Sequence, residues 1–507
     1  MTPARVRFAP SPTGALHIGG LRTALYNYLL ARQTGGTMIL RIEDTDQTRF
    51  VPGAEDYIIK SLEWAGINID EGPVQGGNKG PYRQSERKEI YKQFTDQLLK
   101  EGKAYYAFDS EAELEAMRER LRASGASGQQ YDQSTRMQMV NSLTLSAEET
   151  ARRIAEGKFV IRMKVESGKK VVLNDLIRGT VEFDSAQVDD KVLMKSDGMP
   201  TYHLANVVDD HLMEITHVIR GEEWLPSAPL HVLLYEAFGW SQSMPSFAHL
   251  PLLLKPDGNG KLSKRDADQL GFPIFPLDWT DPRTGETARG YKESGYLPDA
   301  LINFLAFLGW NPGTDQEIFS MEQLIASFSL ERISKSGARF DIHKAQWFNQ
   351  QYIRMRSAGE LARWLQSQCA QKSIPCSEEK AEKIASVLKE RITFPSDLWN
   401  AGEFFFTPPT QFDLGVVSKK KTPQTEKVLD KYAIELSDKP RISDADAQAL
   451  LEKVCLEEGI KTGQVLQLLR VCLTGAAGGP DLMPSISILG GIECRARINS
   501  ALLKFKS

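Results

Sequence analysis

Cysteine is scarce in this sequence, and long hydrophobic runs are absent. Its 507 residues include five cysteines, the first of them Cys369, and none has the short paired spacing of a metal or redox motif. An odd, scattered set indicates reduced thiols rather than a disulfide framework, which predicts a cytoplasmic protein. No run of about 20 apolar residues occurs, so we expect no membrane span. No basic start followed by an apolar core occurs near the N-terminus, so we expect no secretory signal.

The net charge is also small. A formal charge of −4 at pH 7 argues against an indiscriminate nucleic-acid binder, because such proteins are usually basic. It leaves room for a local basic surface that binds RNA, since the distribution of charge matters more than its sum. Apolar residues make up 41% and charged residues 25%, the balance of a soluble globular protein. At roughly 100–200 residues per domain, this length predicts about three to five domains.

The N-terminal segment has the pattern of a strand–helix–strand unit. Residues 5–9 alternate between polar and apolar side chains like a short strand. Residues 21–29 place apolar side chains on one helical face, and residues 38–42 have the composition of a second strand. This order predicts an α/β domain with a parallel sheet. Ligands of such sheets bind at the carboxyl ends of the strands, which places residues 9–20 and 43–46 around one crevice.

Two segments carry side chains suited to phosphate chemistry. Residues 10–20 read Pro-Ser-Pro-Thr-Gly-Ala-Leu-His-Ile-Gly-Gly, so glycines and unpaired helix N–H groups can meet a phosphate while His17 donates a hydrogen bond. Residues 261–265 read Lys-Leu-Ser-Lys-Arg, and such cations can close over a triphosphate whose pyrophosphate leaves. Each segment alone has a plainer interpretation. The first is then a connecting loop with a half-buried histidine, and the second is a solvated basic loop.

Together the two segments resemble the signatures of class I aminoacyl-tRNA synthetases, which are written HIGH and KMSKS. The first reads His-Ile-Gly-Gly from His17, and the second has Leu262 and Arg265 in place of Met and Ser, departures that are common in the glutamyl branch. Further segments between about residue 4 and residue 350 resemble glutamyl-tRNA synthetases of bacterial type. They are residues 7–14, 41–46, 80–87, 195–211 and 219–224.

This resemblance implies a Rossmann-type nucleotide-binding catalytic domain, interrupted by an insertion, and an all-helical C-terminal region. The expected divisions are the first half of the catalytic domain at 1–104, an inserted subdomain for the tRNA acceptor end at 105–194, the second half at 195–255, the KMSKS-like loop with a stem-contact region at 256–325, and the helical anticodon-binding region at 326–507. The implied reaction is that of a glutamate–tRNA ligase. ATP activates L-glutamate as glutamyl-adenylate, and the 3′-terminal adenosine of tRNA(Glu) accepts it, with release of AMP and pyrophosphate.

The resemblance also implies which residues form each site. The expected glutamate pocket consists of Arg7, Ser11, Glu43, Tyr202, Asn206 and Arg220. The expected ATP site consists of Ala9, Thr13, His17, Gly19, Gly20, Glu223, Trp224, Leu253, Lys261 and Lys264. The expected catalytic groups are His17, Lys261, Ser263 and Lys264. The candidate contacts to unstacked anticodon bases are Arg391, Gln464, Arg470 and Thr474, with helix packing as their alternative role.

The residues of the expected glutamate pocket have suitable chemistry. Arg7 and Arg220 can each present a guanidinium fork to a carboxylate, and Glu43 can hold the ammonium group of an amino acid. The plainer interpretations are structural ion pairs, between Arg7 and Glu43 and between Arg220 and either Glu222 or Glu223. Two further pocket residues lie four positions apart, at 202 and 206, so they share a face if that stretch is helical.

No zinc site is expected, although some bacterial relatives carry a Cys/His zinc cluster in the inserted subdomain. Residues 18–202 contain neither cysteine nor histidine, the ligands that structural zinc requires. Mg²⁺ is expected with ATP, bound through the phosphates rather than in a protein cage. The expected partners are tRNA(Glu), L-glutamate and ATP, with a monomeric protein and no membrane.

Several alternatives stay open. Residues 266–295 are interpreted as a surface loop, with a tRNA contact as the alternative. A truncated relative that glutamylates a modified base lacks an anticodon module, which the helical region after residue 326 opposes. Glutaminyl-tRNA synthetase usually ends in β-barrels, and Arg220 suits a carboxylate better than an amide. A non-catalytic tRNA-binding protein is opposed by the intact His17 and Lys261. The sequence does not distinguish charging of tRNA(Glu) alone from charging of both tRNA(Glu) and tRNA(Gln).

Overall fold

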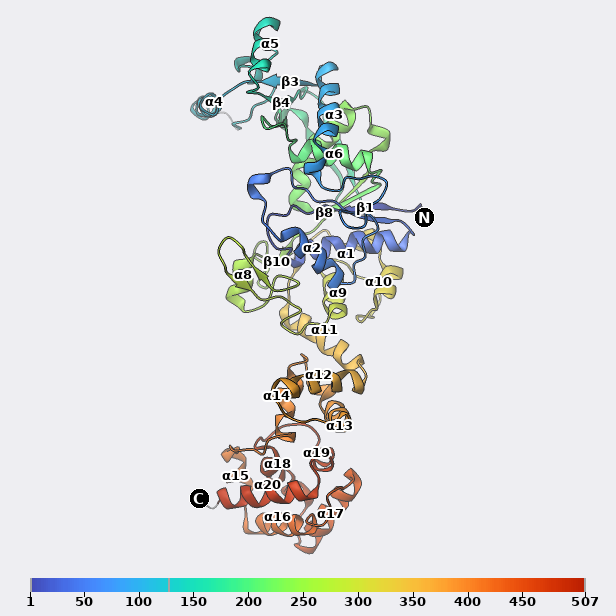
Figure 1. Cartoon of the computed structure of the whole chain (residues 1–507), viewed down its shortest axis with the longest axis vertical. Coiled ribbons are helices and arrows are strands. Elements are labelled where there is room, and N and C mark those ends of the chain that lie inside the picture. Colours follow the sequence, from blue (N-terminus) through green and yellow to red (C-terminus); the bar gives the residue numbers. More distant parts are fainter. Residues whose placement is uncertain (1, 126–127, 506–507) are drawn as a thin grey trace. The chain divides into compact units, whose positions relative to one another are not determined.

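The computed structural model of the chain describes residues 2–125 and 128–505, except for the side chain of Lys264 (Figure 1). It divides into two compact units. The first comprises Met1–Ser294 and Leu301–Ile342, and the second comprises Gly295–Ala300 and His343–Ser507. The helical region predicted to begin at residue 326 therefore begins later. The reason is that β13 (Ala338–Arg339) pairs in parallel with β10 (Leu253–Leu254) of the first unit.

The first unit is built on a six-stranded sheet with the order β2-β1-β8-β9-β5-β6. Its strands are β1 (Arg5–Phe8), β2 (Thr37–Leu40), β5 (Lys170–Asp175), β6 (Gly179–Asp184), β8 (His217–Gly221) and β9 (Ser246–Leu250). All neighbours are parallel except β6, which runs antiparallel to β5. The predicted strand–helix–strand unit is confirmed, because α1 (Ile18–Gln33) connects the adjacent parallel strands β1 and β2.

Helix α1 is buried on more than the one face that its apolar spacing predicts. The apolar residues between 21 and 29 are all buried, but so are Arg22, Tyr26 and Asn27. Two of them donate to distant segments: the hydroxyl of Tyr26 donates to the carbonyl of Ala306 at 2.9 Å, and Asn27 Nδ2 donates to the carbonyl of Ile219 at 3.1 Å. Helix α1 is therefore a central helix of this unit rather than a surface helix.

Among the described residues, nine further α-helices precede residue 330. They are α2 (Ala54–Trp64), α3 (Lys88–Lys100), α4 (Glu111–Ala123), α5 (Ala147–Ala155), α6 (Tyr202–Leu212), α7 (Ala228–Ala237), α8 (Lys264–Leu270), α9 (Pro298–Phe307) and α10 (Met321–Ser327). Helix α6 confirms the helical stretch on which the shared face of Tyr202 and Asn206 depends.

The segment predicted as an insertion contains a small separate sheet, but it also contributes two strands to the central sheet. The separate antiparallel sheet has the order β3-β4-β7, formed by β3 (Ala104–Ala107), β4 (Val160–Met163) and β7 (Val192–Met194). The hairpin β5–β6 instead joins the central sheet, with Asp175 of β5 opposite Phe247 of β9. Val171 and Leu173 face the core of that sheet, so assigning residues 170–184 to the insertion was wrong. Alternation within a strand predicts the strand and does not identify its neighbours.

A buried carboxylate holds the insertion together. Asp190 accepts a hydrogen bond from the hydroxyl of Tyr105 at 2.6 Å and from the backbone N–H of Val165 at 3.0 Å. Its other neighbour is the guanidinium of Arg136, whose Nε lies 3.3 Å away. Burial raises the pKa of Asp190 to about 6 in spite of these partners. Tyrosine, arginine and carboxylate side chains thus fill the centre of this segment.

Residues 266–295 are more deeply packed than a surface loop. The hairpin of β11 (Trp279–Thr280) and β12 (Thr287–Ala288) is exposed at its tip, but Phe272, Ile274 and Phe275 before it are buried. Phe272 stacks on Phe340 with ring centroids 4.7 Å apart. The surface-loop interpretation is therefore wrong for residues 272–275, which form part of the core beside α1.

The described residues of the second unit contain helices and no strand. Its helices are α11 (Ile342–Met355), which begins at the boundary, α12 (Ala358–Gln371), α13 (Glu378–Leu388), α14 (Asp397–Gly402), α15 (Leu414–Lys420), α16 (Pro423–Glu435), α17 (Asp444–Glu457), α18 (Leu466–Thr474), α19 (Leu482–Leu489) and α20 (Gly491–Lys504). The predicted all-helical C-terminal region is confirmed. Within the described ranges, no helix has the length and apolar character needed to cross a membrane.

The composition of the insertion predicts a protein without zinc. Among the described residues, no group of three or more His, Cys, Asp or Glu side chains is placed to hold a metal ion. Elemental analysis of the purified protein should therefore find well under one zinc per chain. Incubation with a chelator should leave the melting temperature unchanged, since the insertion is held by the Asp190 network. One tightly bound zinc per chain would contradict this prediction.

Candidate functional site

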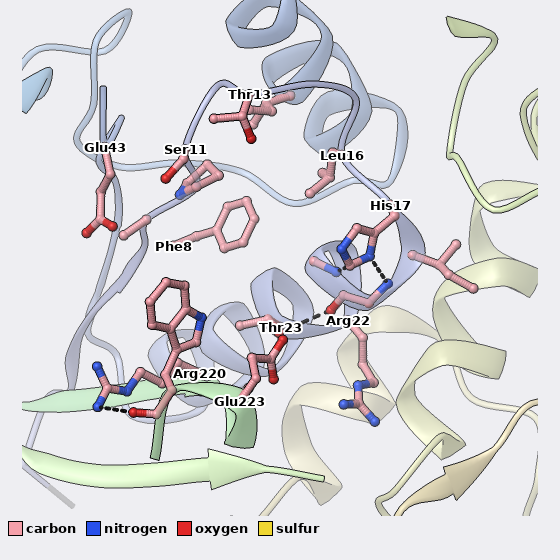
Figure 2. Close-up of a pocket in the computed structure, with 18 of the residues that line it drawn as sticks. Phe8, Ser11, Thr13, Leu16, His17, Arg22, Thr23, Glu43, Arg220 and Glu223 are labelled. Carbon is pink, nitrogen blue, oxygen red and sulfur yellow. Dashed lines mark hydrogen bonds between the residues drawn. The ribbon is translucent and has the colours of Figure 1, made fainter. Parts of the chain in front are cut away.

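A cavity of about 510 Å³ opens at the carboxyl ends of β1 and β8 (Figure 2). All but one of the residues predicted for glutamate and ATP line it. These lining residues are Arg7, Ala9, Ser11, Thr13, His17, Gly19, Gly20, Glu43, Tyr202, Asn206, Arg220, Glu223, Trp224, Leu253 and Lys261. Figure 2 shows His17 at one end of the cavity, with Glu43 and Arg220 at the other. The side chain of the remaining residue, Lys264, lies outside the described part of the chain.

His17 is the N-cap of α1. Its Nδ1 accepts hydrogen bonds from the backbone N–H groups of Gly19 at 3.0 Å and Gly20 at 3.2 Å. The N–H of Ile18 donates to the carbonyl of Ile274 at 2.9 Å. The prediction that unpaired N–H groups of this helix meet a phosphate is therefore wrong. Those donors already have partners, because the imidazole and residue 274 cap the helix.

The capping role fixes the tautomer of His17. Two N–H donors converge on Nδ1, so this atom carries the lone pair, and the neutral ring carries its hydrogen on Nε2. The protein atoms crowded around the ring lower the pKa of His17, and the nearby cation of Lys261 lowers it further. Near neutral pH the ring therefore offers one N–H donor, at Nε2, while Nδ1 stays engaged with the helix.

An ion pair lies at the same end of the cavity. Lys261 Nζ is 3.1 Å from Oε1 of Glu223, and both side chains are about half exposed. Burial opposes the ionisation of Glu223, but its own backbone N–H and Lys261 together lower its pKa. Lys261 is thus a cation on a long, flexible side chain, which pairs with a carboxylate at the cavity and can turn to an anionic ligand.

Ser263 does not line the cavity, although it was predicted to be catalytic. It is the N-cap of α8, and its hydroxyl accepts from the N–H of Asp266 and donates to the carboxylate of that residue. This reciprocal capping box explains the serine in the Lys-Leu-Ser-Lys motif by helix initiation. The structure assigns Ser263 to the start of α8 rather than to the pocket.

Arg220 is a buried cation whose described partners are all uncharged. It is 5% exposed. Its Nε donates to Nε2 of His249 at 3.0 Å, and its Nη1 donates to the hydroxyl of Tyr202 at 2.8 Å. Its Nη2 donates to the carbonyl of Trp224 at 3.3 Å. Among the described residues no carboxylate lies within ion-pair distance of it, and this guanidinium lines the cavity.

The expected alternative for Arg220, an ion pair with a neighbouring glutamate, is wrong. Glu222 instead pairs with Arg178, with 2.5 Å between the guanidinium nitrogen and the carboxylate oxygen. Glu223 pairs with Lys261. Each glutamate is directed elsewhere because β8 ends at Gly221 and the chain turns into a 3₁₀ helix at Glu222–Ser227.

Beneath the cavity, six charged side chains form a buried cluster that is electrically balanced. The cations are Arg7, Arg41 and Arg87, and the anions are Glu43, Asp209 and Asp210. Arg7 Nε lies 3.0 Å from Asp210, and Arg41 lies 3.1 Å from Glu43. The predicted direct ion pair between Arg7 and Glu43 is therefore wrong.

Glu43 also receives a hydrogen bond from Asn206 Nδ2 at 3.1 Å. Burial raises the pKa of Glu43, while the guanidinium groups of Arg41 and Arg7 oppose the increase. A cationic group entering the cavity beside Glu43 would add to that stabilisation of the carboxylate. Asn206 and Glu43 thus lie on the same side of the cavity as Arg220.

Several residues of the site were missed by sequence analysis. Ile274 lines the cavity and accepts from the first N–H of α1, but it lies in a segment interpreted as a loop. His231 and His249 are buried beside Arg220, from α7 and β9. No local motif points to them, since their spacing from Arg220 becomes meaningful only when β8, β9 and α7 are packed together.

The residues predicted to read RNA lie in the second unit and gather around α18. Arg470 donates to the carbonyl of Pro480, and Arg391 lies 3.9 Å from Asp481. Burial lowers the pKa of Arg470, and the charge of Arg391 adds to this shift. Thr474 donates to the carbonyl of Arg470 at 2.9 Å. Gln464 is set apart in a short 3₁₀ helix, where its side chain accepts from the N–H of residue 461 at 2.9 Å.

Comparisons with known proteins cover both units. The family model described as tRNA synthetases class I (E and Q), catalytic domain, matches residues 3–347, and an anticodon binding domain model matches residues 358–502. Glutamate–tRNA ligases of Cytophaga hutchinsonii and Amoebophilus asiaticus are 57% and 56% identical to this chain, over 98% and 99% of it and 97% and 98% of their own lengths.

Two solved structures are similar over nearly the whole chain. A glutamate–tRNA ligase from Elizabethkingia meningosepticum, in complex with its amino acid, superposes with a TM-score of 0.95 at 47% identity, covering 99% of this chain and 100% of that one. A glutamate–tRNA synthetase from Elizabethkingia anophelis gives a TM-score of 0.92 at 48% identity, covering 99% of both chains.

The cap formed by His17 predicts different stabilities for two substitutions. His17→Asn keeps a favoured N-cap acceptor and should leave the melting temperature nearly unchanged. His17→Ala removes the acceptor and should destabilise the protein by about 1 kcal/mol, the usual cost of losing an N-cap. Thermal unfolding of both variants beside the unmodified chain measures the difference. Equal melting temperatures for the two variants would contradict the capping role.

Proposed function

The chain belongs to the class I tRNA synthetases of the glutamate and glutamine group, and from this premise we propose how its pocket performs the reaction of a glutamate–tRNA ligase. The enzyme is an aminoacyl-tRNA synthetase, a ligase that forms a carbon–oxygen bond between glutamate and tRNA. In the proposed first step, the α-carboxylate of glutamate attacks the α-phosphate of ATP and pyrophosphate leaves. In the second step, the 2′-hydroxyl of the terminal adenosine of tRNA(Glu) attacks the activated carbonyl and AMP leaves.

We infer the preference for glutamate from Arg220, whose guanidinium is buried in the cavity wall without a neutralising partner among the described residues. The cluster beneath the cavity already balances three cations with three anions. Arg220 is outside that cluster and its described partners are neutral. A buried cation without a counter-charge is costly, so a ligand carboxylate is the natural partner. We assign the side-chain carboxylate of glutamate to Arg220.

The other residues assigned to the two substrates lie at opposite ends of the same cavity. At the Arg220 end, Glu43 is assigned to the ammonium group of glutamate, with Tyr202 and Asn206 as hydrogen-bonding neighbours. At the other end, where His17 lies (Figure 2), Nε2–H of His17 and the ammonium of Lys261 are assigned to the phosphates of ATP. Alignment of the two substrates and this positive charge supply the catalysis, and no side chain has to become covalent.

Mg²⁺ is proposed to enter with ATP as the metal complex of its phosphates. The described residues offer no group of three or more ligating side chains that would form a protein cage. A Mg²⁺ ion carried by the nucleotide neutralises phosphate charge during the transfer. Within the chain, Lys261, Lys264 and His17 are the groups assigned to orient the same phosphates.

The proposed tRNA contacts follow the two units. The insertion is assigned to the acceptor end and the helical unit to the anticodon, with Arg391, Gln464, Arg470 and Thr474 as candidate contacts to unstacked bases. The anticodon-domain match at residues 358–502 argues against a truncated relative that glutamylates a modified base. We further propose a monomeric enzyme that acts in the cytoplasm.

ATP–pyrophosphate exchange tests the function directly. Exchange that requires glutamate, and that rises when tRNA(Glu) is added, is the expected result. A non-catalytic tRNA-binding protein would give no exchange under any of these conditions. Charging assays with purified tRNA(Glu) and tRNA(Gln) then establish whether the enzyme accepts one tRNA or both.

The basic loop is expected to act mainly on the transition state. Lys264→Ala should lower kcat for charging by about 10²–10³, the scale of losing one preorganised electrostatic contact, with a smaller change in KM for glutamate. Lys292→Ala is the control, since that exposed lysine does not line the cavity. An unchanged kcat in Lys264→Ala would show that the basic loop is only a solvated surface segment.

Arg220 should determine the preference for glutamate over glutamine. A guanidinium offers only donors, so it pairs with both oxygens of a carboxylate but opposes the NH₂ of an amide. Arg220→Ala should lower kcat/KM for glutamate by at least about tenfold to a hundredfold and narrow the preference over glutamine. Arg178→Ala is the matched control, because it removes a neighbouring guanidinium that braces Glu222. A loss of melting temperature with an unchanged glutamate-to-glutamine ratio would show that Arg220 is only a structural brace.

A further inference from the structure

Arg220 is held from behind by a chain of hydrogen bonds that begins at a buried carboxylate. Asp175, at the end of β5, lies 2.6 Å from Nδ1 of His249, on β9. Nε2 of His249 accepts from Nε of Arg220 at 3.0 Å. His249 is fully buried and Asp175 is 4% exposed. Neither residue lines the cavity, so they contact the ligand site only through Arg220.

The chain has one consistent arrangement of hydrogens. Arg220 can only donate, so Nε2 of His249 must be the acceptor, and the hydrogen of the neutral ring is on Nδ1, where it donates to Asp175. The other oxygen of Asp175 accepts from the backbone N–H groups of Ile177 at 2.9 Å and Arg178 at 2.8 Å. The backbone N–H of His249 also donates to the oxygen that faces the ring, at 3.1 Å. The carboxylate is therefore oriented by three backbone donors and selects the tautomer of His249.

A second imidazole lies on the opposite side of the guanidinium. Nδ1 of His231 is 3.5 Å from Nη1 of Arg220, and Nε2 of His231 is 3.2 Å from Nδ1 of His203. With Nδ1 of His231 accepting from Arg220, its Nε2–H donates to His203. Burial lowers the pKa of both His231 and His249, and the charge of Arg220 lowers them further. Both imidazoles are thus neutral acceptors beside a cation.

Imidazole acceptors leave the charge of Arg220 available for a ligand, whereas a carboxylate partner would neutralise it. A carboxylate bound directly to Arg220 would neutralise it and compete with the ligand for the same fork. A neutral imidazole fixes one N–H of the guanidinium and leaves the positive charge for a ligand anion. The imidazole ring of His249 separates the negative charge of Asp175 from Arg220. Asp175 therefore orients the acceptor nitrogen of His249 without binding the guanidinium itself.

We propose that Asp175 and His249 are positioning residues that orient Arg220 and thereby determine the preference for a carboxylate over an amide in the amino-acid substrate. This inference rests on the proposed assignment of Arg220 to the glutamate side chain. It adds two residues from β5 and β9, and it connects the hairpin β5–β6 to amino-acid choice. The hairpin supplies Asp175, and β9 supplies His249 opposite β8.

Asp175→Asn is the decisive variant, because it preserves shape while it removes the negative charge and replaces one acceptor oxygen with an NH₂ donor. The amide oxygen is held by the N–H groups of Ile177 and Arg178, so its NH₂ faces Nδ1 of His249. The imidazole must then accept at Nδ1 and carry its hydrogen on Nε2, where it meets the donor of Arg220. A wrong histidine tautomer of this kind, produced by an Asp→Asn change, is known to cost much activity in serine-protease triads.

The expected result is a selective loss of glutamate recognition. Calorimetric titration of the full chain should show that Asp175→Asn weakens glutamate binding about tenfold to a hundredfold, with a smaller effect on glutamine. In charging assays, KM for glutamate should rise more than kcat falls, and KM for ATP should stay constant. Asp190→Asn is the matched control, because this buried carboxylate of the insertion also accepts from one side chain and from the backbone, and it should leave glutamate affinity unchanged.

A pair of substitutions at His249 gives an independent measurement. His249→Gln retains an amide oxygen that can accept from Arg220 and an NH₂ that can donate to Asp175, so it should recover most of the glutamate affinity. His249→Leu retains neither and should resemble Asp175→Asn. If His249→Leu does not fold, the comparison of Asp175→Asn with His249→Gln still decides the question.

The outcomes separate this inference from the function on which it rests. Absence of glutamate binding and exchange in the unmodified chain would overturn the proposed function itself. Normal activity of the unmodified chain, with the same glutamate-to-glutamine ratio in Asp175→Asn and His249→Leu, would overturn only the positioning role. Equal weakening of glutamate and glutamine binding in both variants would also overturn it, since that pattern indicates a general loss of pocket structure.

Discussion

The buried ion cluster beneath the cavity is the interaction on which the rest of the site depends. It draws on the end of β1, the residues after β2, the start of α3 and the last turns of α6. Charged groups tolerate burial only when each has a partner, and removing one partner typically costs about 3–5 kcal/mol. Three cations and three anions satisfy this condition among themselves, with Arg41 fully buried between Glu43 and Asp210. The carboxyl ends of two parallel strands are thereby fixed relative to α6, which carries Tyr202 and Asn206.

Because the charges of this cluster balance one another, none of its carboxylates neutralises Arg220, which can recognise an anion at one end of the cavity. Arg220 stands outside the cluster, on β8, and its charge is not neutralised by any described residue within ion-pair distance. Only three positions later, Glu223 pairs with Lys261 at the other end of the cavity, and Trp224 stacks near Tyr202 with ring centroids 4.5 Å apart. One short stretch after β8 therefore supplies groups to both ends. Amino acid and nucleotide can be aligned because the backbone itself fixes the spacing of their partners.

Sequence analysis predicted the features that depend on local pattern or on a long family resemblance. The α/β order and the helix at Tyr202 are confirmed by the structure, which also places nearly all residues predicted for glutamate and ATP around one cavity. What it missed depends on residues that are distant in sequence. The partner of Arg7 is Asp210, not Glu43, and the two imidazole acceptors of Arg220 come from β9 and α7. The capping role of Ser263 was readable locally, because an acidic residue follows it three positions later. The resemblance of residues 261–265 to the family motif led instead to the prediction of a catalytic role for Ser263.

The packing beside α1 favours glycine over histidine at the last position of the first motif. Gly20 occupies the last position of His-Ile-Gly-Gly, and a Cβ atom there would lie 2.5 Å from Cδ1 of Leu16, which is buried. A side chain at that position would therefore require Leu16 to move. His17 is left as the single imidazole of the motif, and its Nδ1 is committed to the helix. Its one remaining donor, Nε2–H, must therefore act together with the cations of the basic loop. Under the proposed function, the first motif supplies one imidazole donor and the second motif supplies the lysines that meet the phosphates of ATP.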